Sequence, residues 1–434
     1  MRTPIPWLAG LLVIATGSFV AFSLTQGQER PPQDTGTPAS TPAEPAEPTQ
    51  VFPEDGTRLA AMMAKLPPLQ RQMLLSAERG ADWLRRSNRS DGRFIYGYLP
   101  DLRIPLPGDH YLRQVESACA LACVSRYLGE ERYAAVARQA ILTLLLDTAL
   151  DGSEPQVRHT TLPALTVNRI GAAGCLVLSI HELPAPGADL LEQAEQLCGY
   201  LRQQQLADGS FDFTAGVKET QIEPDAILFY PAQAITGLLH SYHAKPAQWK
   251  VECTTKALGY YRDWWRAHKN LAMVPWLTAA FAEAFILSKE QAFVDAVNEM
   301  NDWLCGLQYA QLDPNHPLWT GGFMEWIDGR QMPSLPTIAS ARFASSLAEG
   351  CRVARRLADT PRYQRYREAL ERCLQYVSTL QYTEANTQHF ADWYRGMLLG
   401  GFHASQQDGN LRIDYTAQAV RAMVQYLELV SSEG

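Results

Sequence analysis

The sequence predicts an all-α fold in which six helical hairpins close into a toroid. Two observations predict it. From Leu69 onward, charged amphipathic helices alternate with helices that are apolar around most of their circumference. The connections between them alternate in the same way, short after an apolar helix and mostly long after a charged one. Exposed helices are amphipathic and helices buried on both sides are apolar all round, so the charged set forms an outer ring and the apolar set an inner ring.

Each element has a predicted range, and strand patterns are almost absent from the sequence. The outer helices are predicted at Leu69–Asn88, Glu130–Leu150, Gly187–Gln205, Ala247–His268, Lys289–Tyr309 and Pro361–Tyr382. The inner helices are predicted at Asp109–Leu128, Leu165–Glu182, Asp225–His243, Leu271–Ser288, Thr337–Leu357 and Asp414–Val430. No linker-like stretch interrupts this series, so residues 54–434 are expected to form one domain.

The long connections run into the inner helices and carry many of the glycines and aromatic residues. They are Arg89–Gly108, Asp151–Ala164, Leu206–Pro224, Ala310–Pro336 and Thr383–Ile413. Long structured loops are usually functional. One face of the toroid is therefore expected to be plain, and the other, here called the loop face, to hold any site.

This pattern resembles the (α/α)6 toroid superfamily over about Leu69 to Val430, chiefly the six-hairpin glycosidase-like enzymes. A weaker resemblance is to the terpenoid cyclase and prenyltransferase toroids. The segment Gln205-x-x-x-Gly209-x-Phe211 is similar to a QW repeat of the cyclases with Phe in place of Trp, and related remnants start at Leu307-Gln308 and Leu380-Gln381. The resemblance implies a fold more specifically than a chemistry.

The N-terminus reads as a targeting segment. Arg2 precedes an apolar run from Trp7 to Leu24, which is near the lower limit of about 17–25 residues for spanning a bilayer. We expect residues 1–25 to be an uncleaved signal-anchor, with a cleaved signal peptide as the alternative, and residues 26–53 to be a Pro/Thr/Glu-rich linker. Arg2 on the cytoplasmic side places the domain in the periplasm or outside the cell, anchored to the inner membrane or secreted.

Composition excludes some classes of partner and cofactor. The formal net charge is −8 and no basic run occurs, so nucleic acid is not an expected partner. No histidine or cysteine spacing typical of a metal site, Gly-rich phosphate loop or dinucleotide fingerprint is present, so we expect no metal and no cofactor. The eight cysteines lie mostly as lone small residues in helical apolar stretches and are expected to be buried free thiols.

Four carboxylates are the candidate catalytic residues, because glycoside hydrolysis uses a pair of them. Glu116 is the strongest, since a glutamate on an inner helix must be paired or line a cavity. Asp414 and Asp225 begin inner helices, where capping explains them equally well. Glu325 lies in the loop segment Gly321-Gly-Phe-Met-Glu-Trp.

Arginines and aromatic residues form the candidate binding set. Arginines at the mouths of inner helices, together with the helix N-termini, favour an anionic ligand; these are Arg113, Arg169, Arg342 and Arg412. Local ion pairs such as Arg113 with Glu116 are the alternative reading. Aromatic rings on the same face suit stacking on a sugar; the candidates are Tyr111, Trp276, Trp319 and Trp393.

Together these features predict an extracytoplasmic carbohydrate-active enzyme, namely a hydrolase, lyase or epimerase acting on an acidic glycan in the central cavity. Two alternatives stay open. One is a terpenoid-cyclase-like toroid acting on an apolar substrate, and the other is a non-catalytic toroid that binds glycan or protein.

Overall fold

The computed structural model describes residues 55–214, 217 and 225–432. The predicted signal-anchor at residues 1–25 and the linker at 26–53 lie outside the described residues. Among the described residues, no helix has the length and apolar character needed to cross a bilayer.

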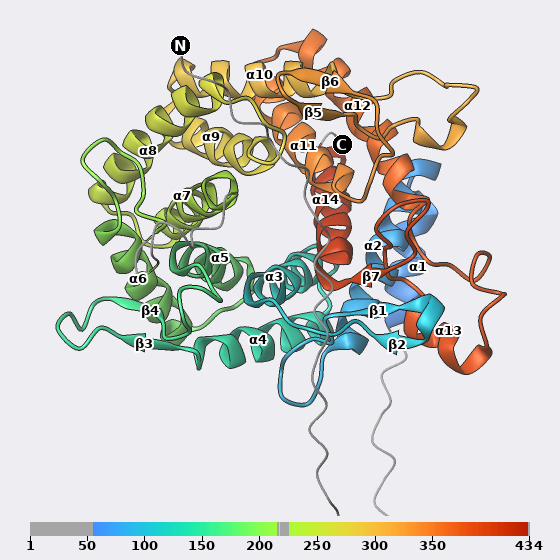
Figure 1. The fold of residues 1–434 in the computed structure, drawn as a ribbon, viewed down its shortest axis with the longest axis horizontal. Helices are drawn as coiled ribbons and strands as arrows, with labels where there is room; N and C mark the ends of the chain where they lie inside the picture. Colours follow the sequence, from blue (N-terminus) through green and yellow to red (C-terminus); the bar gives the residue numbers. More distant parts are fainter. Residues whose placement is uncertain (1–54, 215–216, 218–224, 433–434) are drawn as a thin grey trace, which may run out of the picture. The chain divides into compact units, whose positions relative to one another are not determined.

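Twelve of the described helices form two concentric rings (Figure 1). The outer helices are α2 (Pro68–Ser87), α4 (Glu131–Leu145), α6 (Ala188–Gln203), α8 (Gln248–Ala267), α10 (Gln291–Cys305) and α12 (Thr360–Ser378). The inner helices are α3 (Tyr111–Leu128), α5 (Arg169–Glu182), α7 (Ala226–Ala244), α9 (Val274–Ser288), α11 (Ser340–Arg356) and α14 (Ile413–Ser431). Helix α1 (Asp55–Lys65) precedes the rings, and the short α13 (Asp392–Leu398) lies in the last long loop.

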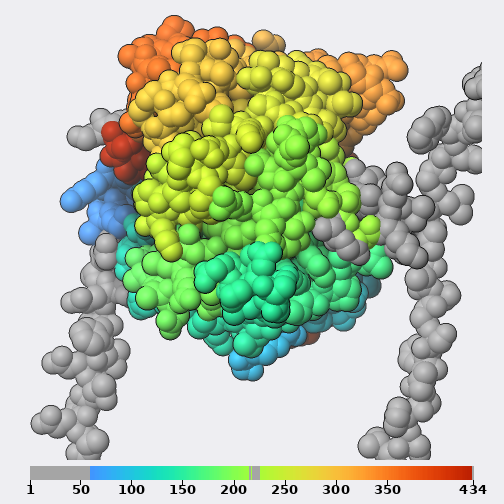
Figure 2. Space-filling view, turned by 90° about the vertical axis from the view of Figure 1, so that its left-hand side faces the viewer, coloured from blue at the N-terminus to red at the C-terminus, as the bar shows by residue number. Residues whose placement is uncertain are grey.

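The inner ring is closed. Each inner helix packs against the next, and α14 packs against α3, which joins the last hairpin to the first. One cluster of buried residues runs from Met73 to Val430 through both rings. In Figure 2 the sequence colours pass in order from teal through green and yellow to orange, as successive hairpins lie side by side. The predicted alternation of inner and outer helices is therefore confirmed.

Short strands pair within the loops. They are β1 (Gly97–Leu99), β2 (Ile104–Pro105), β3 (Thr148–Leu150), β4 (Arg158–Thr160), β5 (Glu325–Ile327), β6 (Arg330–Met332) and β7 (Leu411–Arg412). Strands β3 and β4 form one antiparallel pair and β5 and β6 another. Strand β1 pairs with both β2 and β7, so the first long loop is attached to the last at the point where the ring closes.

Several predicted outer helices run too far. Residues 148–150, predicted as the end of a helix, form strand β3, and α10 and α12 end at Cys305 and Ser378. After α10 and α12 the apolar pattern continues because Leu307 and Leu380 are also buried. At the ends of four outer helices, α2, α6, α10 and α12, the chain leaves the helix through one recurring turn.

In this amide–glycine–phenylalanine turn, a side-chain amide donates to the carbonyl of a glycine with φ between 85° and 95°, and the phenylalanine two residues later is buried. The four sets are Asn88, Gly92 and Phe94; Gln205, Gly209 and Phe211; Gln308, Gly321 and Phe323; and Gln381, Gly400 and Phe402. Each glutamine amide also donates to a carbonyl of a neighbouring outer helix, as Gln381 Nε2 does to Ser76 O at 2.9 Å. The turn therefore ties one outer helix to the next, and it contains all three QW-like remnants seen in the sequence.

Candidate functional site

The inner helices enclose a cavity on the ring axis, here called the axial cavity. It is lined by residues of α3, α7, α9, α11 and α14 and holds about 600 Å³ of empty space, open solvent at its mouth included. Three predicted site residues from three different helices line it together: Glu116, Trp276 and Arg342.

Buried polar atoms without partners converge on the axial cavity. They are Glu116 Oε2, Trp276 Nε1, Arg342 Nε, Gln418 Nε2 and Gln425 Oε1, and none has a hydrogen-bond partner among the described residues. Polar atoms buried in a protein are nearly always hydrogen-bonded, and each one left unpaired costs about 1–3 kcal/mol. A set of such atoms around one space indicates a site made for a polar ligand.

Glu116 lies in the second turn of α3, followed by Ser117, Ala118 and Cys119. Only 9% of the residue is exposed. No arginine, lysine or histidine forms an ion pair with it among the described residues, contrary to the expected pairing with Arg113. A buried, unpaired carboxylate that faces a cavity is available for proton transfer or for a ligand hydrogen bond.

Trp276 and Arg342 stand in the first turns of α9 and α11, where the long loops give way to helix. Pro275 occupies an early position of α9 that needs no backbone N–H. The Arg342 guanidinium carbon lies 5.9 Å from the centroid of the Phe229 ring. An indole and a guanidinium thus face the axial cavity from neighbouring helices.

Sequence reasoning missed several residues that face the axis. Polar residues recur at i, i+3, i+7 and i+10 along α11 and α14, and we call each such row an axial stripe. The stripes are Arg342, Ser345, Glu349 and Arg352 on α11, and Gln418, Arg421, Gln425 and Glu428 on α14. This spacing puts every member on one face of a helix. This spacing is visible in the sequence and could have identified the residues that face the axis.

A second cavity opens toward the plain face, at the C-terminal ends of the inner helices. It holds about 1,000 Å³ of empty space, open solvent included, and shares Glu349, Arg421 and Gln425 with the axial cavity. Here Arg126 pairs with Glu182 and, at 3.2 Å, with Glu428.

Polar contacts link every neighbouring pair of inner helices at this end. Besides those of Arg126, the linking pairs are His240–Glu182 at 3.9 Å, His243–Glu283 at 2.5 Å, Arg352–Glu283 at 2.8 Å and Arg355 Nη1–Leu429 O at 2.7 Å. We call this set the polar belt. It closes the ring at the plain face.

Asp414 and Arg412 lie at the closure of the ring and not in the axial cavity. Asp414 was expected to cap its helix, but it is the second residue of α14, is 1% exposed, and makes no cap. Both of its carboxylate oxygens accept hydrogen bonds of 2.7 Å from Arg412. Arg113 Nε lies 3.5 Å from the same carboxylate, and its guanidinium also contacts the Tyr96 hydroxyl. These residues join the first inner helix to the last at the closure of the ring, here called the seam.

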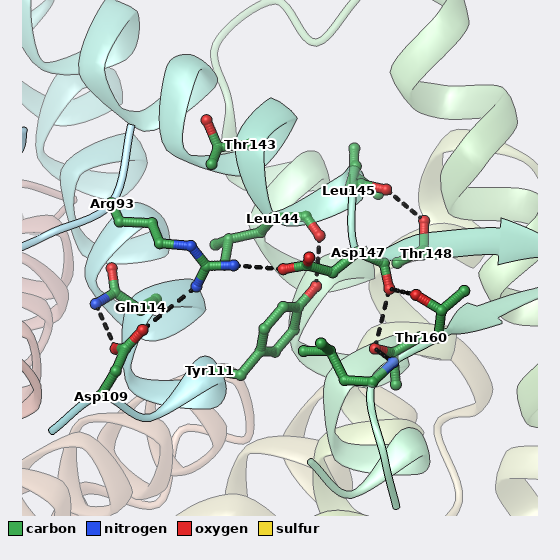
Figure 3. A network of polar contacts seen from close by, with 12 residues as sticks. Arg93, Asp109, Tyr111, Gln114, Thr143, Leu144, Leu145, Asp147, Thr148 and Thr160 are labelled. Atoms are coloured by element: carbon green, nitrogen blue, oxygen red, sulfur yellow. Dashed lines mark hydrogen bonds and ion pairs between the residues drawn. The ribbon is translucent and has the colours of Figure 1, made fainter. Parts of the chain in front are cut away.

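Tyr111 points away from the axis. Its hydroxyl donates to Leu144 O at 2.7 Å, next to the ion pair of Arg93 with Asp147 (Figure 3). Arg93 also lies 3.4 Å from Asp109, which accepts a hydrogen bond of 2.7 Å from Gln114. This network fixes the first long loop against α3 and α4, and it occupies the Tyr111 hydroxyl.

The remaining predicted residues do not join the axial cavity. Asp225 and Glu325 are exposed, and Asp225 makes no side-chain cap of α7. Trp393, on α13, is 65% exposed, and Trp319 stacks on His316 at a centroid distance of 3.8 Å. Arg169 begins α5 and has a buried Nε without a hydrogen-bond partner among the described residues. Nor do three or more His, Cys, Asp or Glu side chains in the described part of the chain converge as a metal site.

Comparison with solved structures shows the fold. A cellobiose 2-epimerase from Bacillus thermoamylovorans B4167 matches with a TM-score of 0.61 and 10% identity over 85% of this chain and 99% of that chain. An inactive α-1,6-mannanase variant of Salegentibacter sp. HEL1_6, in complex with α-1,6-mannotriose, matches at 0.54 and 10% over 82% and 98%. An unsaturated glucuronyl hydrolase from Bacillus sp. GL1 matches at 0.57 and 14% over 82% and 96%.

A type II terpene cyclase from Scytonema also matches, with a TM-score of 0.50 and 14% identity. No protein-family profile matches the sequence, and no curated protein is similar to it at a significant level. At 10–14% identity these likenesses establish the fold alone. The described rings are an (α/α)6 toroid, a fold shared by carbohydrate-active enzymes.

Proposed function

We propose that this protein is a carbohydrate-active enzyme that acts on an acidic glycan bound in the axial cavity, with Glu116 as its acid/base residue. The observation that carries the proposal is the convergence of five unpartnered buried polar atoms on one cavity that also holds an indole ring. The predicted N-terminal targeting segment supports an extracytoplasmic site of action.

The unpartnered atoms fit hydroxyl groups. Trp276 Nε1, Arg342 Nε and Gln418 Nε2 are donors, while Glu116 Oε2 and Gln425 Oε1 are acceptors. A sugar ring carries hydroxyls that both donate and accept, and its C–H face can lie on the Trp276 indole. An apolar terpenoid would leave all five atoms unsatisfied at about 1–3 kcal/mol each. This cost disfavours the cyclase alternative.

Two carboxyl groups line the axial cavity from different helices. Glu349 on α11 is partly buried, which raises its pKa, while the Arg352 guanidinium 2.7 Å away acts in the opposite direction. A carboxyl whose pKa is raised above its ordinary value is the better candidate for a general acid. We assign Glu349 as the acid and Glu116 as the base or nucleophile of a glycoside hydrolysis. A lyase or an epimerase would use Glu116 as the base in the same position.

An acidic substrate is favoured by Arg342, whose Nε faces the axial cavity without a partner in the described part of the chain. Guanidinium groups bind carboxylates and sulfates in a planar, two-bond geometry. Among the structural neighbours, an unsaturated glucuronyl hydrolase acts in glycosaminoglycan degradation, as its name states. That neighbour makes uronate-containing glycans the first class of substrate to test.

The test is a degradation screen with the purified full-length chain. Uronate-containing and sulfated polysaccharides are compared with neutral ones, and new reducing ends or unsaturated products are measured. Glu116→Gln removes the titratable group and keeps the shape, so activity should fall about 10²–10⁴-fold. The matched control is Glu131→Gln, the same substitution on an exposed residue of α4, which should retain activity.

Three results would overturn the proposal. The first is an active enzyme whose Glu116→Gln variant keeps its activity. The second is a folded protein that converts no member of the panel. The third is saturable glycan binding without turnover, which would assign the chain to the non-catalytic alternative.

A further inference from the structure

Arg421 occupies the level of the ring where the two cavities meet. It lies in the middle of α14 and lines both the axial cavity and the plain-face cavity. Glu349 on α11 and Thr236 on α7 line both cavities at the same level. A ligand bound at Arg421 can therefore enter through the axial cavity or through the plain-face cavity.

The other arginines of the plain-face cavity are engaged. Arg126 and Arg352 each contact two glutamates, and Arg355 donates to a main-chain carbonyl. Arg421 differs, because no hydrogen bond or ion pair joins its guanidinium to any other residue that the structure describes. A guanidinium carries five N–H donors and keeps its charge. Arg421 is partly exposed and lines both cavities, so these donors are free to bind a ligand that enters either one.

The charges nearby do not take the place of a partner. Burial lowers the pKa of Arg421, and Cys119, Cys123, Glu182 and Glu116 together outweigh burial, so the pKa lies above its ordinary value. Of the two carboxylates, Glu182 is held by Arg126 and by His240 on the plain-face side. Glu116 faces the axial cavity from α3 and makes no ion pair with Arg421 among the described residues. These groups keep the guanidinium charged and leave its donors free.

A second donor lies one turn away on the same axial stripe. Gln418 precedes Arg421 by three residues, and its Nε2 is buried without a partner in the described part of the chain. Gln425, four residues after Arg421, also faces this space. Residues three and four apart share a helix face, so the two amides flank the guanidinium.

From this arrangement we infer that Arg421 is an anion receptor at the centre of the ring. It takes a planar or tetrahedral oxyanion, namely a carboxylate or a sulfate, through two N–H donors, and Gln418 supplies a further hydrogen bond. In the context of the proposed function, on which this step rests, the oxyanion is the acidic group of the glycan. Arg421 is then the residue that determines specificity for acidic sugars.

The receptor has a property that is independent of the enzyme activity. Because Arg421 lines the plain-face cavity as well, a small inorganic anion can reach it without filling the axial cavity. The assignment of the anion site can therefore be tested with sulfate alone. A failure of the proposed function would leave that result standing.

The experiment is a titration of the full-length chain with sodium sulfate, followed by calorimetry at constant ionic strength against sodium chloride. Sulfate should bind saturably, and Arg421→Gln should weaken binding by about tenfold or more because the bidentate donor is lost. Arg421→Lys should weaken it less, since the charge is kept. Arg330→Gln is the matched control, because Arg330 is exposed on β6, and it should bind like the parent chain.

A second titration compares glucuronate with glucose. Preference for glucuronate that disappears in Arg421→Gln would support the role in substrate recognition. Circular dichroism and thermal melting confirm that each variant is folded, and Arg421→Lys serves if the glutamine variant does not fold. Sulfate binding of equal affinity in the parent and in a folded Arg421 variant, or no saturable sulfate binding by the parent, would overturn the inference.

Discussion

Arg113 Nε lies 3.5 Å from Asp414 Oδ2, and this contact joins the first inner helix of the ring to the last. Arg412 holds the same carboxylate with two hydrogen bonds of 2.7 Å. Strand β7, which contains Arg412, pairs with β1 directly before this point. The ring therefore closes through a carboxylate shared by two arginines. This geometry favours a structural role for the cluster over the ligand-binding role suggested by the sequence.

Asp414→Asn should destabilise the ring, because it leaves two partly buried guanidinium groups without their shared anion. We expect the free energy of unfolding to fall by about 3 kcal/mol, as when one partner of a buried ion pair is removed. Arg412→Lys should cost less, since one of the two parallel hydrogen bonds can persist. Urea denaturation followed by circular dichroism measures both changes.

The control for the seam is Asp392→Asn. Asp392 pairs with Arg395 on α13, but its side chain is 94% exposed, so its loss should not measurably change stability. If Asp414→Asn were as stable as Asp392→Asn, the structural role of the cluster would be refuted. That result would favour a ligand-binding role for Arg412.

Gly400→Ala tests the amide–glycine–phenylalanine turn. A Cβ at this position would lie 2.2 Å from Arg79 O, and the backbone has φ of 92°, which a side chain disfavours. We expect a loss of more than about 2 kcal/mol in the free energy of unfolding, because backbone strain and a main-chain clash add. Gly396→Ala on α13 is the control. Its Cβ would meet no atom within 4 Å, and alanine should stabilise the helix slightly.

The fold was predictable because the buried faces of helices produce a repeating pattern of apolar residues in the sequence. The alternation of α3 with α4, or of α11 with α12, follows from which helices carry charge around their girth. The ends of helices were less predictable. Residues 148–150 pair as a strand with residues 158–160, and no local pattern distinguishes that pairing from a continued helix.

The candidate site was predictable only in part. Glu116, Trp276 and Arg342 stood out because each interrupts an apolar helix or begins one. Arg421 and Glu349 were missed because the inner helices were read as apolar on every side. The spacing of the polar residues in the two axial stripes instead indicates that one narrow face of α11 and of α14 is polar.

Loop positions could not be placed from sequence at all. Glu325 and Trp393 are in segments rich in glycine and aromatic residues, as Phe323 and Phe402 are, yet the first two are exposed and the last two are buried. Tyr111 looked like a residue at the cavity mouth, but its hydroxyl is taken by Leu144 O in the network around Arg93. Such outcomes depend on contacts between residues far apart in the chain.

The cysteines should be unreactive in the native state. All eight are free thiols, and all but Cys305 are buried. Burial raises the pKa of Cys198 and Cys253 to about 12 and that of Cys305 to about 11. The hydrogen bond with Cys123 lowers the pKa of Cys119, but that residue is 2% exposed and out of reach of a reagent in the native state. Because the thiolate is the reactive form, a thiol reagent at pH 8 should label the native chain slowly and all eight sites rapidly after unfolding in urea. A reducing agent should leave the melting temperature unchanged, and a clear drop would reveal a disulfide.

Glu283 should make the stability of the ring depend on pH in the acid range. Burial would raise the pKa of this carboxyl, but the Arg352 guanidinium at 2.8 Å and the hydrogen bonds from Arg352 and His243 lower it to about 2. A carboxyl whose pKa is lower in the folded state stabilises that state above its unfolded pKa of about 4.3. The contribution, about 3 kcal/mol at neutral pH, is lost as the pH falls from about 4.5 toward 2.

Glu283→Gln tests this dependence through urea denaturation at a series of pH values from 3 to 7. The variant should be less stable than the parent at pH 7, and the difference should narrow steadily below about pH 4.5, because the parent loses its ion pair while the variant has none to lose. Glu384→Gln is the matched control, since Glu384 pairs with Arg79 at 3.6 Å on the surface with a side chain 67% exposed, and it should change stability little at any pH. A difference between the parent and Glu283→Gln that stays constant across this range would mean that packing, and not the charge of Glu283, holds α9 to α11 in the polar belt.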